Sequence, residues 1–501
     1  MFEGLDIGIQ TAFTPFNILM VAVGCFTGTF IGMLPGLGPA TAVALMIPMS
    51  YSLDPAAALI LMAGVYYGAA FGGSTASILI NAPGCSSSAV TTFDGYPMAQ
   101  QGRAGKALAV AAWASFIGGT LSAFALLIAA PLLSQVALNF QSPDYFVMMV
   151  MGLTAVAALS AQGQVLRGYA MAVVGMMLAT VGTDGTSGVP RLTFGQLDLI
   201  DGFSFLLIAM ATYALAEMVL VILEGRLNPG DHVRATEMRE LMLSRDEVRD
   251  VAPVIGRHSI LGFLVGVLPG AGATVASFFS YALEKKITGD SARPAFGEGN
   301  VRGVAAPECA NNAASTGSFV PLLTLGIPGS GTTAIMLGAL IAHGLQPGPR
   351  LYVDHPDVFW SVIVSMFLGN LMLLCINLPM IPWLARLLRI PQPVLMPVVM
   401  LFCLLGVYLV SFDAMDIVIM VIITLVAILL RWLDFPLAPL LLGFILGGYL
   451  EDNLQRTMIL YDGGLSFLWE RSACLVMLLF TVALLLWPLI SRVRGAVPAE
   501  R

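Results

Sequence analysis

The stretch IGMLPGLGPATAVAL, residues 31–45, interrupts an apolar segment with a Leu-Pro-Gly sequence at Pro35. A similar stretch, VGVLPGAGATVASFF, occupies residues 265–279, and the two align with Pro35 opposite Pro269 at an offset of 234. Proline removes a backbone donor from a helix, and glycine adopts conformations that other residues avoid. Each stretch therefore predicts a helix that breaks inside an apolar segment.

A second pair of breaks follows the first in the same order. LINAPGCSSSAV, residues 79–90, aligns with TLGIPGSGTTAI, residues 324–335, with Pro83 opposite Pro328 at an offset of 245. Two matched pairs in one order indicate two homologous repeats, with a substrate site where the discontinuous helices meet. The predicted helix breaks are at Pro35, Gly36, Pro83, Gly84, Pro269, Gly270, Pro328 and Gly329.

The composition places these breaks in a membrane. Of the 501 residues, 58% are hydrophobic and 11% are charged, whereas soluble domains carry about 25% charge. At roughly 20 residues a span, the chain accommodates about ten to fourteen membrane segments. The net charge of −7 has the wrong sign for a nucleic-acid surface, so no nucleic acid is expected as a partner. We expect an all-α, multi-pass protein of the lipid bilayer.

The apolar runs differ in length, and several are too short to cross alone. A twelve-residue helix reaches about 18 Å, whereas the hydrocarbon core is about 30 Å thick. Lipid tolerates such pieces only where their free backbone groups face protein or a water-filled cavity, which favours broken or re-entrant helices. The predicted runs are 16–33, 55–71, 107–133, 145–161, 169–181, 203–223, 258–283, 316–325, 332–343, 358–384, 394–410, 417–433, 438–449 and 473–490.

One long hydrophilic segment divides the chain. Residues 224–257 hold thirteen charged residues, six of them arginines, which predicts a cytoplasmic connector by the positive-inside rule. It separates a first repeat half at 1–223 from a second half at 258–501, which also includes C-terminal membrane helices. We expect the two repeats to be inverted, although counting segments leaves a parallel arrangement open.

Residues 258–283 lie between two basic clusters. The connector precedes them, and four basic residues follow: Lys285, Lys286, Arg293 and Arg302. If both clusters are cytoplasmic, the segment enters the membrane and returns, with Pro269 at the turning point. A single tilted span is the alternative.

Hydroxyl-rich residues follow two of the breaks. Ser and Thr at a helix start cap free N–H groups, and the remaining donors at the positive end of the helix dipole favour an anion. A carboxylate substrate is therefore chemically reasonable, and capping without a ligand is the alternative. With two amides from a later tract, the predicted substrate-binding residues are Asn81, Ser86, Ser87, Ser88, Asn311, Asn312, Ser330, Thr332 and Thr333.

That later tract, APECANNAAST at residues 306–316, carries an acid and two amides ahead of an apolar run. Ionisable groups at membrane depth are costly and indicate function, although Glu308 at the membrane interface would cost little. Carbonyls freed at the breaks are further ligands for a cation such as Na⁺. We also expect Asp94 to lie in a loop and Glu217 to make a hydrogen bond inside the bundle. The predicted coupling-ion residues are Ser74, Thr75, Glu308 and Thr316.

Several long motifs, spread over nearly the whole chain, carry a family resemblance. They include TTFDGYPMAQQGRAGKALAVA, APECANNAASTGSFVPLLTLGIPGSGTTAIMLGALIAHGLQPGP and GFILGGYLEDNLQR. These motifs resemble the large membrane subunit of the tripartite tricarboxylate transporter family. The matching positions are the 81–88 tip, Asp94, the 308–316 tract and the 330–333 tip.

The resemblance implies a function and partners that the composition does not. It implies a bacterial inner-membrane permease that imports tri- or dicarboxylates, or related organic anions, with a Na⁺ or H⁺ gradient. It also implies two protein partners, a small four-helix membrane subunit and a periplasmic solute-binding protein. The carried anion, the coupling ion and the oligomeric state stay open.

Other functions find less support in the sequence. The chain has no Gly-x-Ser-x-Gly, no His-Glu-x-x-His and no Walker lysine, so neither an intramembrane enzyme nor an ATP-driven pump is expected. A passive anion channel or exchanger with re-entrant pore loops is the main alternative to a secondary transporter. We expect no cofactor and no metal beyond a coupling Na⁺.

Overall fold

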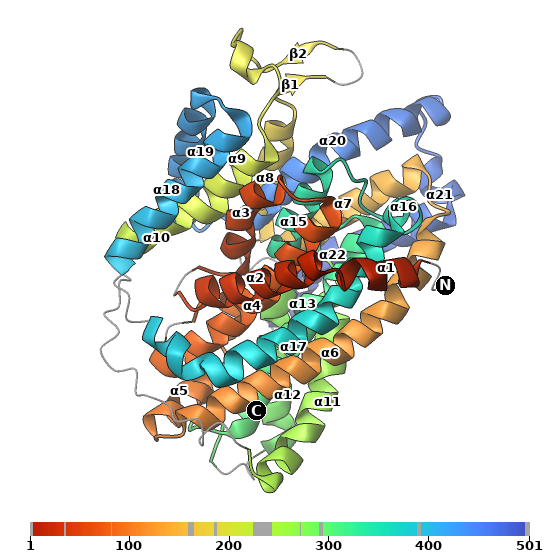
Figure 1. Cartoon of the computed structure of the whole chain (residues 1–501). Coiled ribbons are helices and arrows are strands. Elements are labelled where there is room, and N and C mark those ends of the chain that lie inside the picture. Colours follow the sequence, from red (N-terminus) through yellow and green to blue (C-terminus); the bar gives the residue numbers. More distant parts are fainter. Residues whose placement is uncertain are drawn as a thin grey trace.

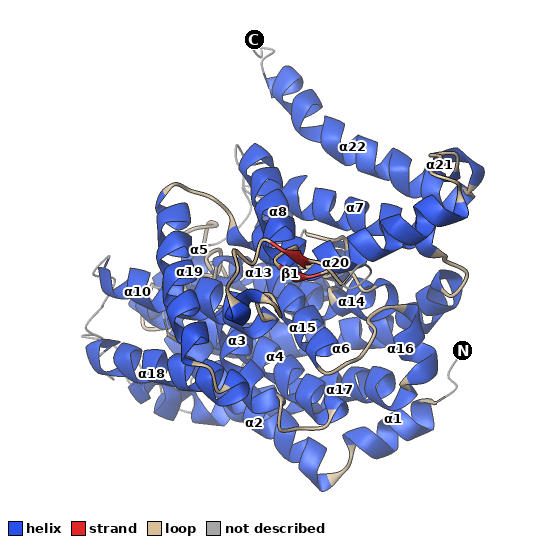
Figure 2. Ribbon diagram, turned by 90° about the horizontal axis from the view of Figure 1, so that it is seen from above, coloured by secondary structure: helices blue, strands red, loops and turns tan. Residues whose placement is uncertain are grey.

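The computed structural model describes residues 4–34, 37–81, 83–158, 165–184, 188–223, 243–270, 272–289, 294–387 and 392–495. The predicted breaks at Pro35 and Gly36, and residues 224–242 of the connector, lie outside the described residues. The described part is almost wholly helical, as Figures 1 and 2 show. Its one sheet is a short antiparallel hairpin of β1 (Gly182–Thr183) and β2 (Pro190–Arg191). The all-α prediction is therefore confirmed.

The helices follow one another closely along the chain. Up to residue 223 they are α1 (Leu5–Ala12), α2 (Pro15–Gly32), α3 (Pro39–Ser50), α4 (Pro55–Ile80), α5 (Thr92–Gln100), α6 (Ala104–Ala137), α7 (Ser142–Ala158), α8 (Val165–Ala179), α9 (Phe205–Ala209) and α10 (Ala216–Leu223). Short turns of tighter or wider helix add η1 (Ser86–Ser88), η2 (Leu197–Leu199) and the π-helical η3 (Met210–Leu215).

After the connector, the described residues form twelve further helices. They are α11 (Arg245–Val267), α12 (Gly272–Thr288), α13 (Val301–Gly317), α14 (Phe319–Leu325), α15 (Gly331–Ala342), α16 (Pro349–Asp354), α17 (Pro356–Leu387), α18 (Gln392–Ser411), α19 (Ala414–Trp432), α20 (Leu437–Leu460), α21 (Phe467–Glu470) and α22 (Ser472–Gly495). Figure 2 shows α22 extending away from the body of the molecule.

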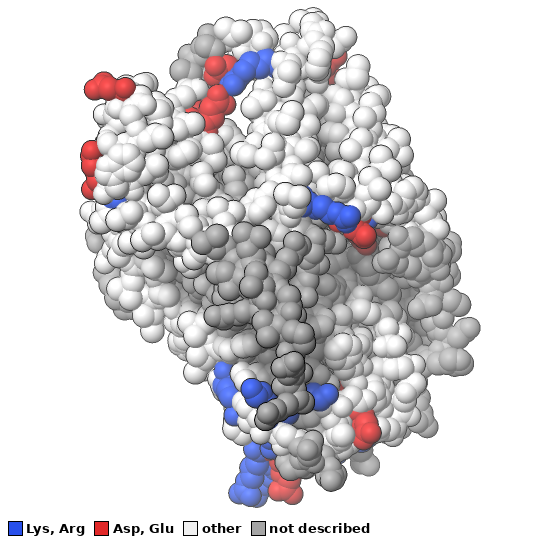
Figure 3. Space-filling model, turned by 180° about the vertical axis from the view of Figure 1, so that it is seen from behind, with Lys and Arg blue, Asp and Glu red and all other residues white. Residues whose placement is uncertain are grey.

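Seven helical stretches of the described chain are long and apolar enough to cross a membrane. They are α2, α4, α6, the continuous α9–η3–α10 stretch, α11, the first part of α17, and α19. Six shorter apolar helices lie in α3, α7, α8, α15, α18 and α22. These lengths and compositions define a multi-pass membrane protein, and the larger number of ten to fourteen segments stays a prediction. Figure 3 shows large uncharged areas on one face, with basic side chains gathered at its lower end.

Two fully buried helices, α4 and α13, form the centre of the molecule. α4 is buried from Ala56 to Leu79, and α13 is buried from Gly303 to Gly317. The helices α2, α3 and α17 pack on α4, whereas α6, α11 and α12 pack on α13. Both central helices are rich in Ala, Gly and Ser, whose small side chains let helix backbones approach closely. The acid-and-amide tract is part of α13 and lies ahead of the apolar α14, as predicted.

Glycines bring the packed backbones into contact where α2 crosses α4. A Cβ atom on Gly28 would clash with the backbone of Val65, and a Cβ atom on Gly32 would clash with the backbone of Ala69. The spacing of four residues keeps both glycines on one face of α2. No larger side chain fits at this crossing without moving a helix.

Glycines also bring the backbones of α11 and α13 into contact where these two helices cross. A Cβ atom on Gly262 would clash with the backbone of Ala310, and a Cβ atom on Gly266 would clash with that of Ala314. One residue beyond the second glycine, α11 ends at Val267, and Leu268 has an extended backbone.

Gly266→Ala is expected to destabilise the folded protein by about 1–3 kcal/mol, because the added methyl group overpacks a backbone contact. Thermal unfolding of the detergent-solubilised protein measures the effect. Gly256→Ala is the matched control on the same helix, since a Cβ atom there meets nothing within 4 Å. Equal unfolding temperatures for the two variants would contradict this packing.

Candidate functional site

The Pro328-Gly329 break, referred to below as the second Pro-Gly tip, joins α14 to α15. α14 ends at Leu325, and Gly326 follows in the left-handed region at φ 69°. The chain then turns, and Ser330 caps α15 reciprocally with Thr333. The Thr333 backbone N–H donates to Ser330 Oγ at 3.3 Å, and the Ser330 backbone N–H donates to Thr333 Oγ1 at 2.8 Å. Such a capping box satisfies two of the free donors at a helix start and leaves others available.

The Pro83-Gly84 break, referred to below as the first Pro-Gly tip, has a similar backbone geometry. α4 ends at Ile80, and Asn81 follows in the left-handed region at φ 53°. Cys85 then takes the place of the capping serine, because its backbone N–H donates to Ser88 Oγ at 3.4 Å. A Cβ atom on Gly84 would clash with the carbonyl of Gly32, so the tip also packs against α2.

The tips meet one another at the centre of the molecule. The Gly270 backbone N–H donates to the Gly329 carbonyl at 3.1 Å, which joins the break after α11 to the break before α15. Ser86 of the first tip and Thr274 of α12 share a hydrogen bond of 2.8 Å between hydroxyl oxygens. Segments far apart in the sequence therefore converge on one place.

A cavity of about 790 Å³ lies at this meeting point. Its walls come from α3, α4, η1, α7, η3, α10, α12, α13, α15, α19 and α20 and from the loops between them. Eight of the predicted site residues line it: Pro83, Gly84, Ser86, Ser87, Gly270, Asn311, Ser330 and Thr332. We refer to it as the central cavity.

Other predicted residues lie beside the central cavity without lining it. The hydroxyl groups of Ser88 and Thr333 each make a hydrogen bond within their own tip, to Cys85 and to Ser330. Asn312 Nδ2 donates to the Glu308 carbonyl at 3.1 Å within α13. The remaining residues outside the lining are Asn81, Pro269, Pro328 and Gly329.

Asn311 presents an unsatisfied amide to the central cavity. Its side chain is 1% exposed, and neither Nδ2 nor Oδ1 has a hydrogen-bond partner in the described part of the chain. Leaving a buried polar group unpaired costs about 1–3 kcal/mol. A polar ligand in the cavity would remove this cost, so Asn311 is suited to binding one.

Two charged residues of the described chain, Glu217 and Arg431, line the central cavity. The sequence analysis did not predict that they form a pair. Arg431 of α19 forms an ion pair with Glu217 of α10, and its Nη2 donates to the Thr212 carbonyl at 3.2 Å. The predicted hydrogen bond of Glu217 is therefore confirmed, and its donor is the charged guanidinium of Arg431. The available signal was that Arg431 is the single charged residue in the apolar run 417–433.

The π-helical turn η3 supplies the carbonyls around this pair. Wider helical turns are often found at functional sites because they redirect backbone groups. Thr41 Oγ1 donates to the Tyr213 carbonyl at 2.8 Å, and Thr424 Oγ1 donates to the Ala211 carbonyl at 3.4 Å. Together with the bond from Arg431, these contacts fix η3 against α3 and α19.

Glu308 lies one turn of α13 away from Asn311 and is 1% exposed. Hydroxyl groups from three helical segments surround its carboxylate. Ser74 Oγ donates to Oε2 at 2.6 Å, Ser115 Oγ donates to the same oxygen at 3.3 Å, and Thr91 donates to Oε1. No basic side chain in the described part of the chain forms an ion pair with it. The carboxylate is thus solvated by neutral donors alone.

The other predicted coupling-ion residues do not reach this carboxylate. Thr75 Oγ1 donates to the Phe71 carbonyl at 3.4 Å, and Thr316 Oγ1 donates to the Asn312 carbonyl at 3.2 Å. Both hydroxyls therefore bond within their own helices. Within the described residues, no group of three or more His, Cys, Asp or Glu side chains could hold a metal ion.

The prediction that Asp94 lies in a loop is wrong. Asp94 is fully buried at the start of α5. Its Oδ1 accepts backbone N–H bonds from Gly297, Gly299 and Asn300 at 2.7–3.0 Å, and its Oδ2 accepts from Tyr281 at 2.9 Å. The surrounding polar sequence concealed the burial, which a loop two hundred residues away provides. Asp94 thus organises the segment before α13.

The fold defines a class: a multi-pass helical membrane protein, here with a cavity at a place where several of its helices begin or end. Comparison with known families is more specific. The chain belongs to the tripartite tricarboxylate transporter TctA family, whose sequence model matches residues 18–442. The family resemblance predicted from the motifs is therefore confirmed. This is a family of membrane transporter components and not of enzymes.

Two relatives from Agrobacterium vitis are similar to the chain. One, described as an uncharacterized 52.8 kDa protein in the TAR-I ttuC' 3'region, is 43% identical over 464 residues, covering 92% of this chain and 91% of the relative. The other, an uncharacterized protein in the TAR-II ttuC' 3'region, is 43% identical over 202 residues, covering 40% of this chain and 83% of the relative. No solved structure matches the chain significantly.

Proposed function

We propose that this chain is the permease subunit of a binding-protein-dependent secondary transporter. It imports tri- or dicarboxylates, or related organic anions, by alternating access at the central cavity, driven by a Na⁺ or H⁺ gradient. The observation that carries the proposal is the convergence of helix breaks from both ends of the chain on one polar cavity. The proposed location is a bacterial inner membrane, and the proposed partners are a small four-helix membrane subunit and a periplasmic solute-binding protein.

Matched contacts support two homologous repeats. The offset of 234 pairs Gly28 with Gly262 and Gly32 with Gly266, and the offset of 245 pairs Val65 with Ala310 and Ala69 with Ala314. The α2–α4 crossing and the α11–α13 crossing are therefore made by corresponding residues. The left-handed Asn81 and Gly326 also correspond at an offset of 245.

Contacts between α11 and α12 support a re-entrant hairpin. Arg257 and His258 of α11 both contact Glu284 of α12, at 2.6 Å and 3.0 Å. Residues on either side of the Pro269 break therefore lie at the same level of the molecule. These contacts favour a segment that enters the membrane and returns, rather than a single tilted span.

The chemistry of the central cavity suits a carboxylate. Arg431 offers a guanidinium group, whose paired donors match a carboxylate, and Asn311 offers an unpaired amide. The capped start of α15 adds backbone donors at the positive end of a helix dipole. A dicarboxylate or tricarboxylate would make several of these contacts at once.

Glu308 supplies a site for the coupling ion next to this cavity. A buried carboxylate with only neutral donors gains from a bound positive charge, which is either H⁺ or Na⁺. Its place on α13, one turn from Asn311, connects ion binding to substrate binding through a single helix. This is the physical basis we propose for symport.

Reconstituted vesicles test the proposal. Proteoliposomes holding the permease and its partner subunits should accumulate labelled citrate or another carboxylate against a gradient when Na⁺ or H⁺ gradients are imposed. Uptake that only equilibrates, with no counterflow, would favour the passive channel instead. Both transport classes predict a hydrophilic cavity, so the energetic coupling is the decisive measurement.

Ser87→Leu is expected to reduce citrate uptake at least tenfold while leaving expression unchanged. Ser87 is 6% exposed and lines the central cavity, so leucine would fill space and remove a hydroxyl group. Ser411→Leu is the control, because Ser411 lies at the exposed end of α18. Normal uptake kinetics in the Ser87 variant would refute the assignment of the cavity.

A further inference from the structure

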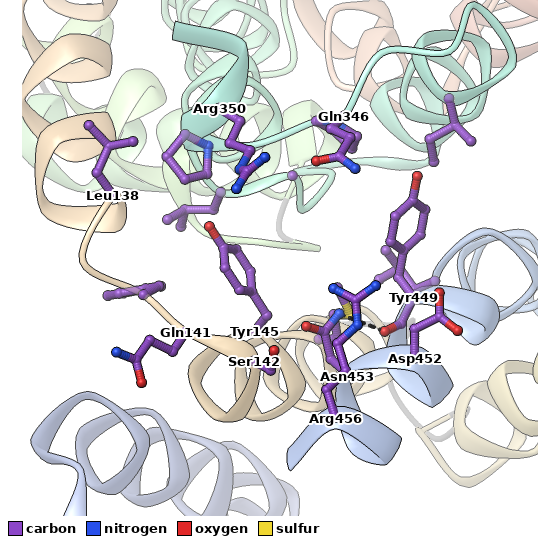
Figure 4. A pocket seen from close by; sticks show the side chains of 18 residues that line it. Leu138, Gln141, Ser142, Tyr145, Gln346, Arg350, Tyr449, Asp452, Asn453 and Arg456 are labelled. Atoms are coloured by element: carbon purple, nitrogen blue, oxygen red, sulfur yellow. Dashed lines mark hydrogen bonds between the residues drawn. The ribbon is translucent and has the colours of Figure 1, made fainter. Parts of the chain in front are cut away.

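A second polar cavity, of about 530 Å³, lies between α7, α16 and α20 (Figure 4). We refer to it as the vestibule. Figure 4 shows side chains from several segments pointing into it, among them Gln346, Arg350, Tyr145 and Arg456. None of the predicted site residues lines it.

The vestibule carries two arginines without an acidic partner. No ion pair within the described residues involves Arg350 or Arg456, whereas Arg191 and Arg471 are paired with Glu451 and Asp144. One acid, Asp452, also lines the vestibule, which leaves its lining with a net positive charge. Unpaired arginine guanidinium groups around a concave polar site attract carboxylates.

The predicted cytoplasmic side of the connector puts the vestibule on the extracytoplasmic side. Lys106 lies in the first turn of α6, and its Nζ contacts Glu247 of the arginine-rich connector at 2.6 Å. Residues just beyond the other end of α6, Leu138 and Gln141, line the vestibule. A helix of 34 residues is about 51 Å long. The vestibule therefore lies across the membrane from the predicted cytoplasmic connector.

The second Pro-Gly tip separates the vestibule from the central cavity. Gly326 lines the vestibule, whereas Ser330 lines the central cavity. Between them, Ile327 is fully buried and packs where Gly152 of α7 leaves room for it. α7 lines both cavities, with Met149 in the vestibule and Val156 in the central cavity.

We propose that the vestibule is a loading site for the organic anion, where Arg350 and Arg456 hold a carboxylate before it passes the second tip. The inference deepens the proposed function and rests on it. It requires that citrate binds the vestibule from the outside, and that charge there governs binding. Both requirements can be measured without any transport.

Thiol labelling of a Gln346→Cys variant tests these requirements in right-side-out vesicles. The probes are an anionic sulfonate and a cationic ammonium methanethiosulfonate, followed at position 346 by mass spectrometry so that native cysteines do not interfere. We expect the anionic reagent to react faster and citrate to protect the thiol. Adding Arg350→Gln and Arg456→Gln should lower the anionic rate about tenfold and remove the protection. Adding Asp452→Asn should raise the anionic rate.

Controls separate local charge from misfolding and from failure of the proposed function. Arg249→Gln changes an exposed arginine of the connector that has no ion pair among the described residues, so it should change nothing, and a neutral maleimide should label all variants at equal rates. Labelling only from the cytoplasmic side, or equal anionic rates in all variants, would overturn the proposal. Protection by a purified solute receptor but not by citrate would also overturn it, in favour of a docking surface. If citrate protects but reconstituted vesicles show no gradient-driven uptake, the proposed function fails instead.

Discussion

Arg431→Gln is expected to lower citrate uptake at least a hundredfold in reconstituted vesicles. Among the described residues, the guanidinium is the one basic group that lines the central cavity, and a charge-assisted bond to a substrate carboxylate contributes about 1.5–3 kcal/mol. The substitution also leaves Glu217 without its partner, which adds a repulsive charge to the cavity. Initial uptake rates over a range of citrate concentrations measure the effect.

Two further variants separate substrate recognition from structural charge balance. The double variant Glu217→Gln with Arg431→Gln removes both charges, so uptake would recover if the arginine only neutralised the acid. We expect no recovery. Arg167→Gln is the matched control, because Arg167 is an exposed residue 4.0 Å from Asp434 and lies outside the cavity lining.

Glu308→Gln is expected to abolish gradient-driven accumulation while citrate counterflow persists. Glutamine keeps the size of the side chain and accepts hydrogen bonds, but it carries no charge for H⁺ or Na⁺ to neutralise. Substrate contacts at Asn311 remain, so exchange of internal for external citrate should continue. Comparing accumulation with counterflow in the same vesicles measures the separation of the two activities.

The control for this experiment is Glu298→Gln, because Glu298 is an exposed acid in the loop before α13. It should accumulate citrate at the normal rate. Unchanged ion-driven accumulation in the Glu308 variant would exclude this residue as the coupling site. If the Glu308 variant loses both counterflow and accumulation, the residue instead has a role in holding α13 in place.

Local sequence features predicted the interrupted helices and part of the site. Pro83 and Pro328 each follow a left-handed residue, Asn81 or Gly326, at which the preceding helix ends. A proline shortly after such a residue is typical of a helix stop. Ser330 and Thr333 predicted a capped helix start, and the structure has the capping box at these residues. Ser88 and Thr333 nevertheless point to the backbone rather than the cavity, since one hydroxyl group can serve either purpose.

Contacts between distant segments were out of reach of the same reasoning. Thr91 and Ser115 hold Glu308, yet no spacing in the sequence relates these three residues. Asp94 was expected in a loop because its neighbours are polar, but a distant backbone segment covers it. Burial depends on which segments pack together, and hydropathy along the chain does not contain that information.

By itself, the sequence determined a helical membrane protein whose helices break at Pro-Gly pairs, because apolar composition and backbone breaking are local properties. Only the tertiary structure decided that Arg431 faces Glu217 in the cavity and that Arg350 and Arg456 share a second one. These arrangements join residues from different helices, and the packing of helices through small side chains sets their distances.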